Sequence, residues 1–440
     1  SHGSHEEHSE TVTRIRSTAL ENGYVVAILQ DLSGPKIRIS NVDGPYLTLE
    51  NGAELIVRHG KDKACTSQVL YVESLDPAQV LQIGHKVLLG DGILSLETIA
   101  NNGTEAICKV VMGGRVRSRM GIAFPDSEVL LPATTSKDLV DLRWGIDNSV
   151  DFIAISFVRD ASDILKLRHE IRKHGGDQRI IAKIERRSAV QNIESILDVS
   201  DGIMVARGDL GVELPLETLP VIQRTLIQQA NYRGVPVIVA TQMLHSMITS
   251  LRPTRAEVSD VSGAVMLGAD ALMLSEETAI GEHPVEAVRY LSSIAMQAEQ
   301  SFQFEEYKPR LRESDWQTVP DAVAYAACGA AIKIDAGAII SCTDTGGSAR
   351  LVAKYRPQQQ LYGASSNPTA LRRMCLYWGV TPVSCAVTGT HHDEVDVALR
   401  NVQERENLPN GSFAVVTSGL SVREAGSTCV MQIRALNFRV

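Results

Sequence analysis

The sequence predicts an α/β protein built on a (β/α)8 TIM barrel, with a small β-barrel lid domain inserted and a second α/β domain at the C-terminal end. Two observations lead to this prediction. Short, continuously apolar segments alternate with amphipathic ones between about residues 121 and 310, and residues 40–118 instead show alternation broken by Asp-Gly and Asn-Gly pairs. Continuous apolar strands are typical of covered parallel sheets, and their even spacing favours a barrel. The second pattern predicts hairpins.

The composition is that of an ordinary globular chain. Of the 440 residues, 44% are hydrophobic and 22% are charged, and the formal net charge is −9. A chain of this length has room for two or three domains. The acidic total argues against a nucleic-acid-binding protein, which needs a basic face. We therefore expect small-molecule ligands and no nucleic-acid partner.

Cysteine usage and hydropathy indicate the compartment. The seven cysteines are widely spaced without a Cys-x-x-Cys pair, which favours reduced thiols over a disulfide framework or a zinc site. No apolar run has membrane-spanning length, and no signal peptide is visible. These features predict a cytoplasmic protein without a membrane partner. We interpret His2, His5 and His8 as a loop and a solvated helical turn, not as a metal site.

The changes of pattern predict three domains. The barrel is expected over residues 1–39 and 119–310, and the lid domain over 40–118. A polar stretch at 299–316 is interpreted as a linker. The C-terminal domain is expected over 318–440, with strands at Ala338–Cys342, Gln360–Ala364, Phe413–Thr417 and Cys429–Ile433.

Six apolar segments are the expected barrel strands, and a helix over Glu7–Asn22 precedes them. The strands are Val25–Leu29, Phe152–Phe157, Ile180–Ile184, Gly202–Ala206, Pro236–Ala240 and Ala271–Leu274. A closed barrel of this type has eight strands. We therefore expect two more upstream of residue 1, and we do not expect a competent enzyme without them. Polar side chains cluster directly after the six segments, where barrel enzymes place their active sites.

The strongest candidate site is formed by Lys183, Glu185 and Asp209. Alternate residues of a strand point to the same side, so Lys183 and Glu185 share a face at one strand end, and Asp209 ends the next strand. Two carboxylates suit Mg²⁺, which keeps part of its shell for water and substrate. The ammonium would stabilise a phosphoryl group during transfer. A structural ion-pair network at the barrel mouth explains the same residues equally well.

Weaker candidates lie at other strand ends. Arg38 could bind a phosphate, although a surface arginine at a domain junction is the simpler interpretation. Thr241 could orient a carboxylate or relay a proton, although threonine here is more often a turn residue. Residues 343–348 (TDTGGS) join a strand to a helix and could form a nest for a phosphate-sized anion, or only a capped turn.

Several longer stretches carry a resemblance to a known family. They are residues 1–3 (SHG), 31–38 (DLSGPKIR), 180–185 (IIAKIE), 203–215 (IMVARGDLGVELP), 239–243 (VATQM), 252–260 (RPTRAEVSD) and 349–357 (ARLVAKYRP). In this order, and over essentially the whole chain, they resemble pyruvate kinase. The resemblance implies transfer of a phosphoryl group from phosphoenolpyruvate to ADP, which gives pyruvate and ATP in glycolysis. It also implies a homotetramer, the usual state of the family.

The resemblance implies roles for the residues that match. Lys183 would neutralise the transferring phosphoryl group and the enolate oxygen. Glu185 and Asp209 would bind Mg²⁺ or Mn²⁺. The amides of Gly208 and Asp209 would hold the substrate carboxylate together with the hydroxyl of Thr241, which also lies near the proton delivered to the enolate.

Further implied roles concern the nucleotide, the lid and regulation. Arg38 and His2 would bind the nucleotide or the transferring phosphate. The inserted domain would act as a lid that brings Asp91 to the site and excludes water. A phosphorylated effector would bind to the C-terminal domain at Thr343, Thr345, Gly346 and Ser348.

The family commonly needs K⁺ as well. Ser1, Asp31 and the carbonyl of Leu32 match three of its ligand positions. Lys36 stands where many members have glutamate. We hypothesise that the Lys36 ammonium, a fixed monovalent cation, replaces K⁺ and makes activity largely independent of it.

Four residues depart from the family pattern. Met120 replaces an expected nucleotide-phosphate lysine, and Ala123 lies in the same altered segment. His245 stands where an acid is usual, and Glu276 where glycine is common. Two alternatives therefore stay open: a non-catalytic, metabolite-binding relative, and a metal-dependent 2-oxo-acid lyase on the same kind of barrel.

Overall fold

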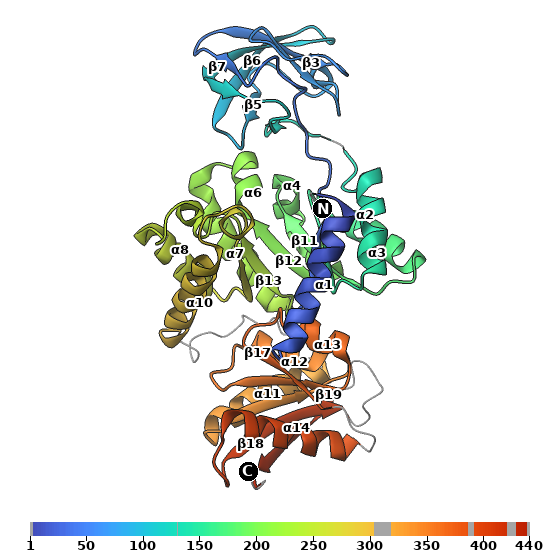
Figure 1. Ribbon diagram of the computed structural model, residues 1–440, viewed down its shortest axis with the longest axis vertical. Helices are drawn as coiled ribbons and strands as arrows, with labels where there is room; N and C mark the ends of the chain where they lie inside the picture. Colours follow the sequence, from blue (N-terminus) through green and yellow to red (C-terminus); the bar gives the residue numbers. More distant parts are fainter. Residues whose placement is uncertain (1–2, 130, 303–317, 386–390, 420–427, 438–440) are drawn as a thin grey trace.

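The protein is described by a computed structural model that covers residues 3–129, 131–302, 318–385, 391–419 and 428–437. Its three units follow one another along the long axis of the molecule. Figure 1 shows a β-rich unit at one end, a helix-flanked sheet in the middle and a C-terminal α/β unit at the other end.

The middle unit contains a curled sheet of six parallel strands. In spatial order these are β1 (Leu29–Asp31), β10 (Phe152–Ile155), β11 (Arg179–Ile184), β12 (Gly202–Ala206), β13 (Val237–Ala240) and β14 (Ala271–Met273). The spatial order equals the order in the chain, as in a barrel. The predicted fold class is thus confirmed, and β1 and β14 form the sheet edges within the described residues.

Helices flank this sheet (Figure 1). They are α1 (His5–Glu21), α2 (Ser136–Asp147), α3 (Ala161–Lys173), α4 (Arg187–Gln191), α5 (Ile193–Val199), α6 (Arg207–Glu213), α7 (Leu219–Arg233), α8 (Arg255–Met266), α9 (Glu276–Ala279) and α10 (Pro284–Gln300). Side chains alternate along each strand. In β12, Ile203 and Val205 therefore join the cluster beneath the helices, while Met204 joins a second cluster on the inner face.

Helix α1 begins two residues earlier than the sequence pattern predicts. The Ser4 hydroxyl accepts a hydrogen bond from the Glu7 amide, and the Glu7 carboxylate accepts one from the Ser4 amide. This capping box stabilises the first turn. The histidines of that turn are not merely solvated, which corrects our interpretation, because the His5 and His8 rings lie 5.7 and 5.6 Å from the Trp144 ring.

The first barrel strand also differs from its prediction. β1 spans Leu29–Asp31 rather than Val25–Leu29, because the register pairs Leu29 with Phe152, the first residue of β10. Val25 and Val26 are each 38% exposed. The apolar run therefore begins four residues before the hydrogen-bonded pairing of β1 with β10.

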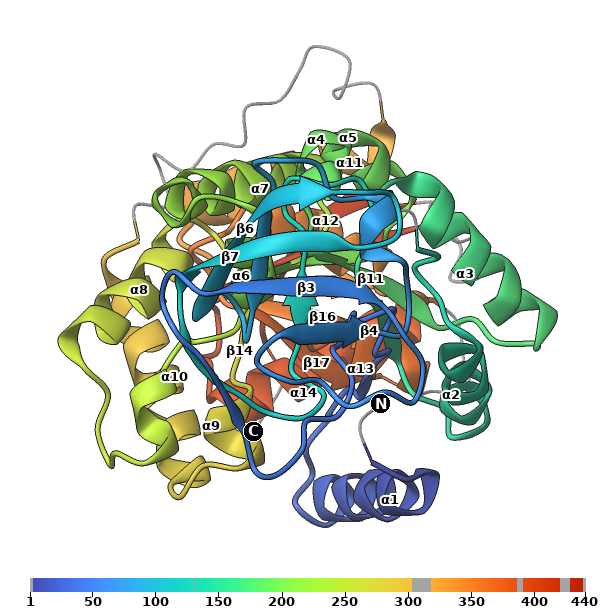
Figure 2. The same cartoon turned by 90° about the horizontal axis from the view of Figure 1, so that it is seen from above.

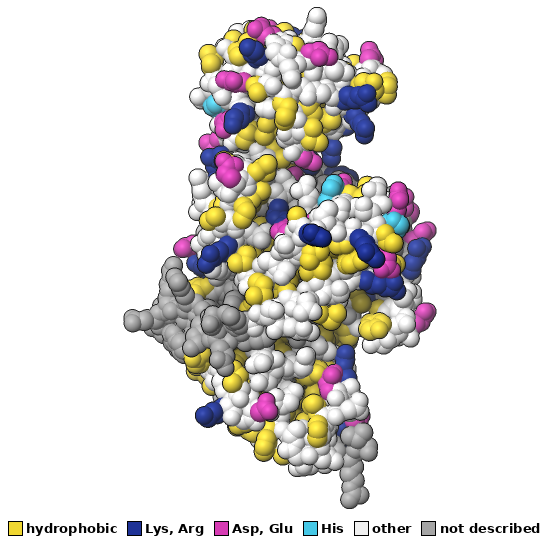
Figure 3. All heavy atoms as spheres, turned by 90° about the vertical axis from the view of Figure 1, so that its left-hand side faces the viewer, with side chains coloured by type: hydrophobic (Ala, Val, Ile, Leu, Met, Phe, Trp, Pro, Cys, Tyr) yellow, Lys and Arg dark blue, Asp and Glu magenta, His cyan; other side chains and the backbone are white. Residues whose placement is uncertain are grey.

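The β-rich unit lies in the chain between β1 and α2, at the place of the predicted lid domain, and is called the lid below. Its strands are β2 (Leu47–Leu49), β3 (Glu54–His59), β4 (Val69–Val72), β5 (Lys86–Leu89), β6 (Leu94–Asn101), β7 (Ala106–Met112), β8 (Gly114–Val116) and β9 (Ile122–Ala123). They enclose a hydrophobic cluster of their own, which includes Val57, Leu70, Val87 and Leu96. Figure 2 shows the lid lying over one end of the central sheet. The space-filling view in Figure 3 shows basic and acidic side chains interspersed on one face of the molecule.

The C-terminal unit is a five-stranded sheet with helices. In spatial order its strands are β17 (Val380–Ser384), β16 (Leu361–Ser365), β15 (Ala338–Cys342), β18 (Phe413–Gly419) and β19 (Thr428–Ala435). Its helices are α11 (Val319–Lys333), α12 (Gly347–Lys354), α13 (Pro368–Met374) and α14 (His391–Glu406). The sequence pattern missed β17 because Pro382 interrupts its apolar run. Proline is tolerated there since β17 is an edge strand.

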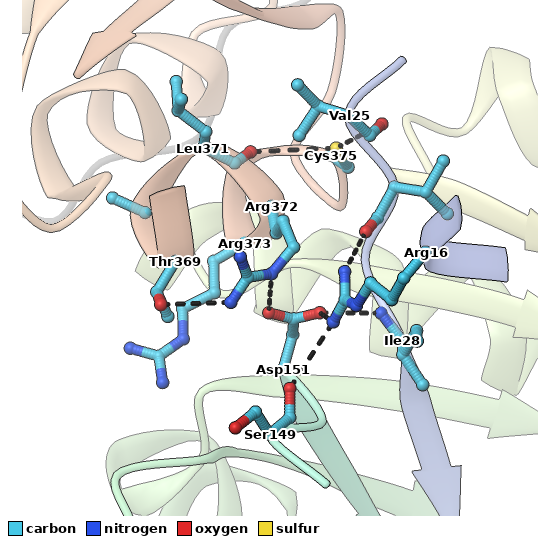
Figure 4. A network of polar contacts seen from close by, with 12 residues as sticks. Arg16, Val25, Ile28, Ser149, Asp151, Thr369, Leu371, Arg372, Arg373 and Cys375 are labelled. Carbon is cyan, nitrogen blue, oxygen red and sulfur yellow. Dashed lines mark hydrogen bonds and ion pairs between the residues drawn. The ribbon is translucent and has the colours of Figure 1, made fainter. Parts of the chain in front are cut away.

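The C-terminal unit docks on the end of the central sheet opposite the lid. Leu376 packs into the inner-face cluster of the sheet. Arg372 on α13 donates a hydrogen bond to the buried carboxylate of Asp151, just before β10, and Arg16 on α1 binds the same carboxylate (Figure 4). Three parts of the chain far apart in sequence therefore meet at Asp151.

Candidate active site

A cavity of about 550 Å³ lies between the lid and the C-terminal ends of β10, β11 and β12. Glu185 and Asp209, the two predicted metal ligands, both line it. Asp91 and Lys36 line it from the side of the lid. The chain places the candidate chemistry where barrel enzymes hold their active sites.

Lys183 lies at the centre of an ionic cluster. Its Nζ is 2.9 Å from Glu185 Oε1 and 3.2 Å from Asp31 Oδ1, and it donates a 2.9 Å hydrogen bond to Ser156 Oγ. Burial alone would lower the pKa of Lys183, but the carboxylates of Glu185 and Asp31 raise it well above its usual range. The ammonium therefore stays charged and is held in one place.

Glu185 is the most deeply buried acid of the site. Its side chain is 1% exposed, and Oε2 accepts a 2.7 Å hydrogen bond from the Phe157 amide. Burial raises the pKa of Glu185, Lys183 opposes this, and the charge of Asp209 raises it further. Two carboxylates are thus held close enough to disfavour each other's charge.

These carboxylates fit a divalent cation that prefers oxygen ligands. Within the described residues, no group of three His, Cys, Asp or Glu side chains is placed to hold a metal. Water and substrate oxygens would have to complete the shell around Glu185 and Asp209, which suits Mg²⁺. A bound cation would also relieve the repulsion between the two carboxylates.

Lys36 reaches the same region from the segment that enters the lid. Its Nζ lies 3.5 Å from Asp209 Oδ1 and 3.8 Å from Asp91 Oδ1. Asp31, which the resemblance assigns to the K⁺ site, contacts Lys183. The Leu32 carbonyl accepts a 2.7 Å hydrogen bond from Ser156 Oγ. Ser1 and His2 lie outside the described residues.

Thr241 and Gly208 are brought together as the resemblance implies. The Gly208 amide donates a 2.8 Å hydrogen bond to Thr241 Oγ1, and that hydroxyl donates to the Ala240 carbonyl. Arg207 Nη2 donates a 2.7 Å hydrogen bond to the Thr241 carbonyl. Thr241 and Gln242 have φ values of 70° and 55°. A β-branched residue rarely adopts such a φ, and strain of this kind is concentrated at functional sites.

Arg38 lies at the base of the lid, outside the wall of the cavity. Its Nη1 donates a 3.0 Å hydrogen bond to the Arg119 carbonyl. Met120 packs against the hydrophobic cluster of the lid, whereas Ala123 lines the cavity. The hydrogen bond to the Arg119 carbonyl therefore anchors Arg38 to the segment between β8 and β9.

Two residues that depart from the family pattern contact each other. His245 Nδ1 lies 3.7 Å from Glu276 Oε2 in the loops that follow β13 and β14. An acid thus lies beside His245, although it comes from a different strand end. Both side chains are more than half exposed.

The candidate effector loop lies in the C-terminal unit, between β15 and α12. The Gly346 amide donates a 3.0 Å hydrogen bond to Thr343 Oγ1, and Gly346 has a φ of 86°. The Ser348 and Thr428 hydroxyls are hydrogen-bonded to each other. The loop is thus a tight turn that glycine permits.

Sequence reasoning missed Ser156 and Phe157. Ser156 bonds Lys183, and the Phe157 amide bonds Glu185. Both directly follow β10, so the rule that polar groups after strands carry chemistry could have found Ser156. Phe157 contributes only its backbone, in a left-handed conformation of φ 55°, and no side-chain pattern signals this.

Taken together, a parallel barrel, an ammonium flanked by carboxylates and a lid over the strand ends define a class of enzymes. Such enzymes bind anionic substrates with the help of a divalent cation. None of the helices in the described residues is both long and apolar enough to cross a membrane. All seven cysteines are described, and each is a free thiol.

Comparison with known proteins identifies the family. The model of the pyruvate kinase barrel domain matches residues 1–288, and that of the pyruvate kinase alpha/beta domain matches residues 321–434. The chain is 40% identical to pyruvate kinase of Geobacillus stearothermophilus, over 99% of this chain and 75% of that protein. It is 34% identical to pyruvate kinase of Clostridium acetobutylicum, over 99% of this chain and 92% of that protein. The chain belongs to the pyruvate kinase family, which confirms the resemblance and the expected class of enzyme.

Proposed function

We propose that this chain transfers the phosphoryl group of phosphoenolpyruvate to ADP and releases pyruvate and ATP. The observation that carries the proposal is the position of Lys183 Nζ, within 3.2 Å of both Glu185 and Asp31 at the floor of the site. An ammonium held there can neutralise negative charge that moves from the phosphoryl group to the enolate oxygen. Mg²⁺ or Mn²⁺ on Glu185 and Asp209 would supply further neutralisation when bound.

The remaining residues orient the substrate. The amides of Gly208 and Asp209 would bind its carboxylate, which requires the Gly208 amide to leave Thr241 Oγ1. The freed hydroxyl is then available to position the proton delivered to the enolate. The Arg207 guanidinium donates to the Thr241 carbonyl and so holds the Thr241 backbone in place. This contact does not involve the Thr241 hydroxyl.

The lid would exclude water that could otherwise accept the phosphoryl group. Asp91 reaches the cavity from the lid, and Lys36 lies between Asp91 and Asp209. Arg38 and His2 would bind the nucleotide. The Lys36 ammonium would also replace the K⁺ ion of the family. The positions that match K⁺ ligands are Ser1, Asp31 and Leu32.

Regulation is assigned to the C-terminal unit. A phosphorylated small molecule would bind to the loop that contains Thr343, Thr345, Gly346 and Ser348, with coupling through subunit contacts in a homotetramer. The tight turn at Gly346 supports this, since it leads directly into the N-terminal end of α12, which favours negative charge.

An assay of pyruvate formation coupled to lactate dehydrogenase tests the proposal. The chain is assayed with phosphoenolpyruvate, ADP and Mg²⁺, alone and with any residues encoded upstream of Ser1. We expect ADP-dependent turnover that falls by about 10³-fold in Lys183→Met and is unchanged in the exposed lid variant Lys109→Met. Pyruvate formation without ADP would point to a lyase. Binding of phosphoenolpyruvate by folded protein without turnover would point to a non-catalytic relative.

A further inference from the structure

Arg186 stands directly after the buried acid Glu185 and lines the same cavity. It also contacts the lid's return segment, defined here as residues 121–129, which leads from the lid back toward α2. Arg186 Nη1 donates a 3.1 Å hydrogen bond to the Val129 carbonyl. Val129 in turn packs against the hydrophobic cluster of the lid.

The same guanidinium lies over an aromatic ring of the site. Its carbon is 5.4 Å from the centre of the Phe157 ring, a distance typical of a cation–π contact. The Phe157 amide donates the 2.7 Å hydrogen bond that fixes Glu185 Oε2. Phe157 adopts a left-handed φ of 55°, a strained conformation for a residue other than glycine that persists only where surrounding contacts support it.

The guanidinium of Arg186 is incompletely paired. Its Nε is buried without a hydrogen-bond partner in the described residues. A partly buried guanidinium with an unused, buried donor is a poor choice for stability alone, and such groups call for another explanation.

We propose that Arg186 is a positioning residue that couples the return segment of the lid to the metal-binding orientation of Glu185. The coupling runs from the Val129 carbonyl through the guanidinium to the Phe157 ring, and from the Phe157 amide to Glu185 Oε2. Movement of the lid then changes divalent-cation affinity, and a bound cation restrains the lid. This inference rests on the proposed function, since it concerns the carboxylate that would bind the cation.

Mn²⁺ alone, without phosphoenolpyruvate or nucleotide, is the probe. Its affinity is measured by the electron paramagnetic resonance of free Mn²⁺, and the return segment is followed by hydrogen exchange with and without Mn²⁺. We expect Arg186→Met to weaken Mn²⁺ binding about tenfold and to abolish the protection that Mn²⁺ gives residues 121–129. Arg186→Lys, which restores a charged donor, should recover part of both effects.

Arg168→Met is the matched control. Arg168 Nη2 also donates to a backbone carbonyl, that of Val199, at 2.8 Å, but it lies on α3 away from the cavity. We expect this variant to lower the unfolding temperature without changing Mn²⁺ affinity. Equal losses of Mn²⁺ affinity in folded Arg186→Met and Arg168→Met, or none in Arg186→Met, would overturn the proposal.

A double-mutant cycle provides an independent test. Phe157→Leu removes the ring but keeps the amide that bonds Glu185. Its effect on Mn²⁺ affinity should be non-additive with that of Arg186→Met, because both variants break the same connection. Additive effects would contradict the coupling. None of these measurements uses turnover, so failure of the kinase assay and failure of this inference are separate results.

Discussion

Arg372 Nε donates a 2.7 Å hydrogen bond to Asp151 Oδ1, and this contact joins the C-terminal unit to the central sheet (Figure 4). The Asp151 side chain is fully buried. Its other oxygen accepts 2.8 Å hydrogen bonds from Arg16 Nη2 and the Ile28 amide. A buried carboxylate with three donors is costly to leave partly unpaired.

Arg372→Met should therefore destabilise the protein. We expect the unfolding free energy to fall by about 2 kcal/mol, less than for a wholly unpaired buried charge because Arg16 remains. Urea unfolding followed by circular dichroism measures this. Arg434→Met is the control, since its 2.7 Å pair with Asp396 is about one-third exposed and should contribute at most about 1 kcal/mol. Equal losses would contradict the role of burial at Asp151.

Lys36 should remove the need for K⁺. We expect the same turnover in Na⁺ and K⁺ buffers, because a fixed ammonium already lies among the site carboxylates. In Na⁺ buffer, the turnover rate of Lys36→Glu should be about tenfold lower, since about 1.4 kcal/mol of transition-state stabilisation corresponds to tenfold in rate. In K⁺ buffer, this variant should regain activity. Lys109→Glu makes the same charge change on the exposed side of β7 and should respond to neither cation. A strict K⁺ requirement in the unmodified chain would refute the hypothesis.

The Thr241 hydroxyl should matter more than its methyl group. Thr241→Val keeps the shape but loses the group that accepts from the Gly208 amide. We expect kcat to fall about 100-fold, as for loss of a proton-positioning group. Thr241→Ser should keep most of the activity. Steady-state kinetics with phosphoenolpyruvate and ADP test this, and a valine variant as active as the serine variant would remove Thr241 from the mechanism.

Asp201 should make stability depend on pH in acid. Burial alone would raise the pKa of Asp201, but the Ile180 amide and the guanidinium groups of Arg168 and Arg179 outweigh it and lower the pKa. The folded state thus binds this proton less readily than the unfolded state. Its stabilisation is present above the unfolded-state pKa and is lost as the pH falls through the lower, folded-state pKa.

Asp201→Asn should accordingly lower the unfolding free energy at pH 7 and flatten its decline in acid. Urea unfolding at pH 7 and at steps down to about pH 3 measures both. Asp198→Asn, on the adjacent helix α5 with a side chain 66% exposed, is the control and should change neither. If the unfolding free energy of Asp201→Asn fell with decreasing pH as steeply as that of the unmodified chain, other carboxylates would be responsible for the decline.

Local patterns in the sequence were enough for five of the six strands of the central sheet and placed several polar residues at their ends. Continuous apolar runs identified β10 to β14 to within one or two residues, and Lys183, Glu185 and Asp209 lie at or shortly after the ends of β11 and β12. This works because alternation and strand ends are properties of neighbouring residues, and parallel strands bring all their carboxyl ends to one side. The division into domains and the assigned roles stay predictions.

Only the tertiary structure decided which distant residues meet. Arg186 and Val129 are 57 positions apart, and Arg372 and Asp151 are 221 apart. The Phe157 amide donates a hydrogen bond to Glu185 from a left-handed backbone conformation, which no residue pattern predicts. Such contacts follow from how the lid and the C-terminal unit pack on the sheet. A hydrogen bond needs two groups within about 3 Å in the right direction, and periodicity along the chain carries no information about that.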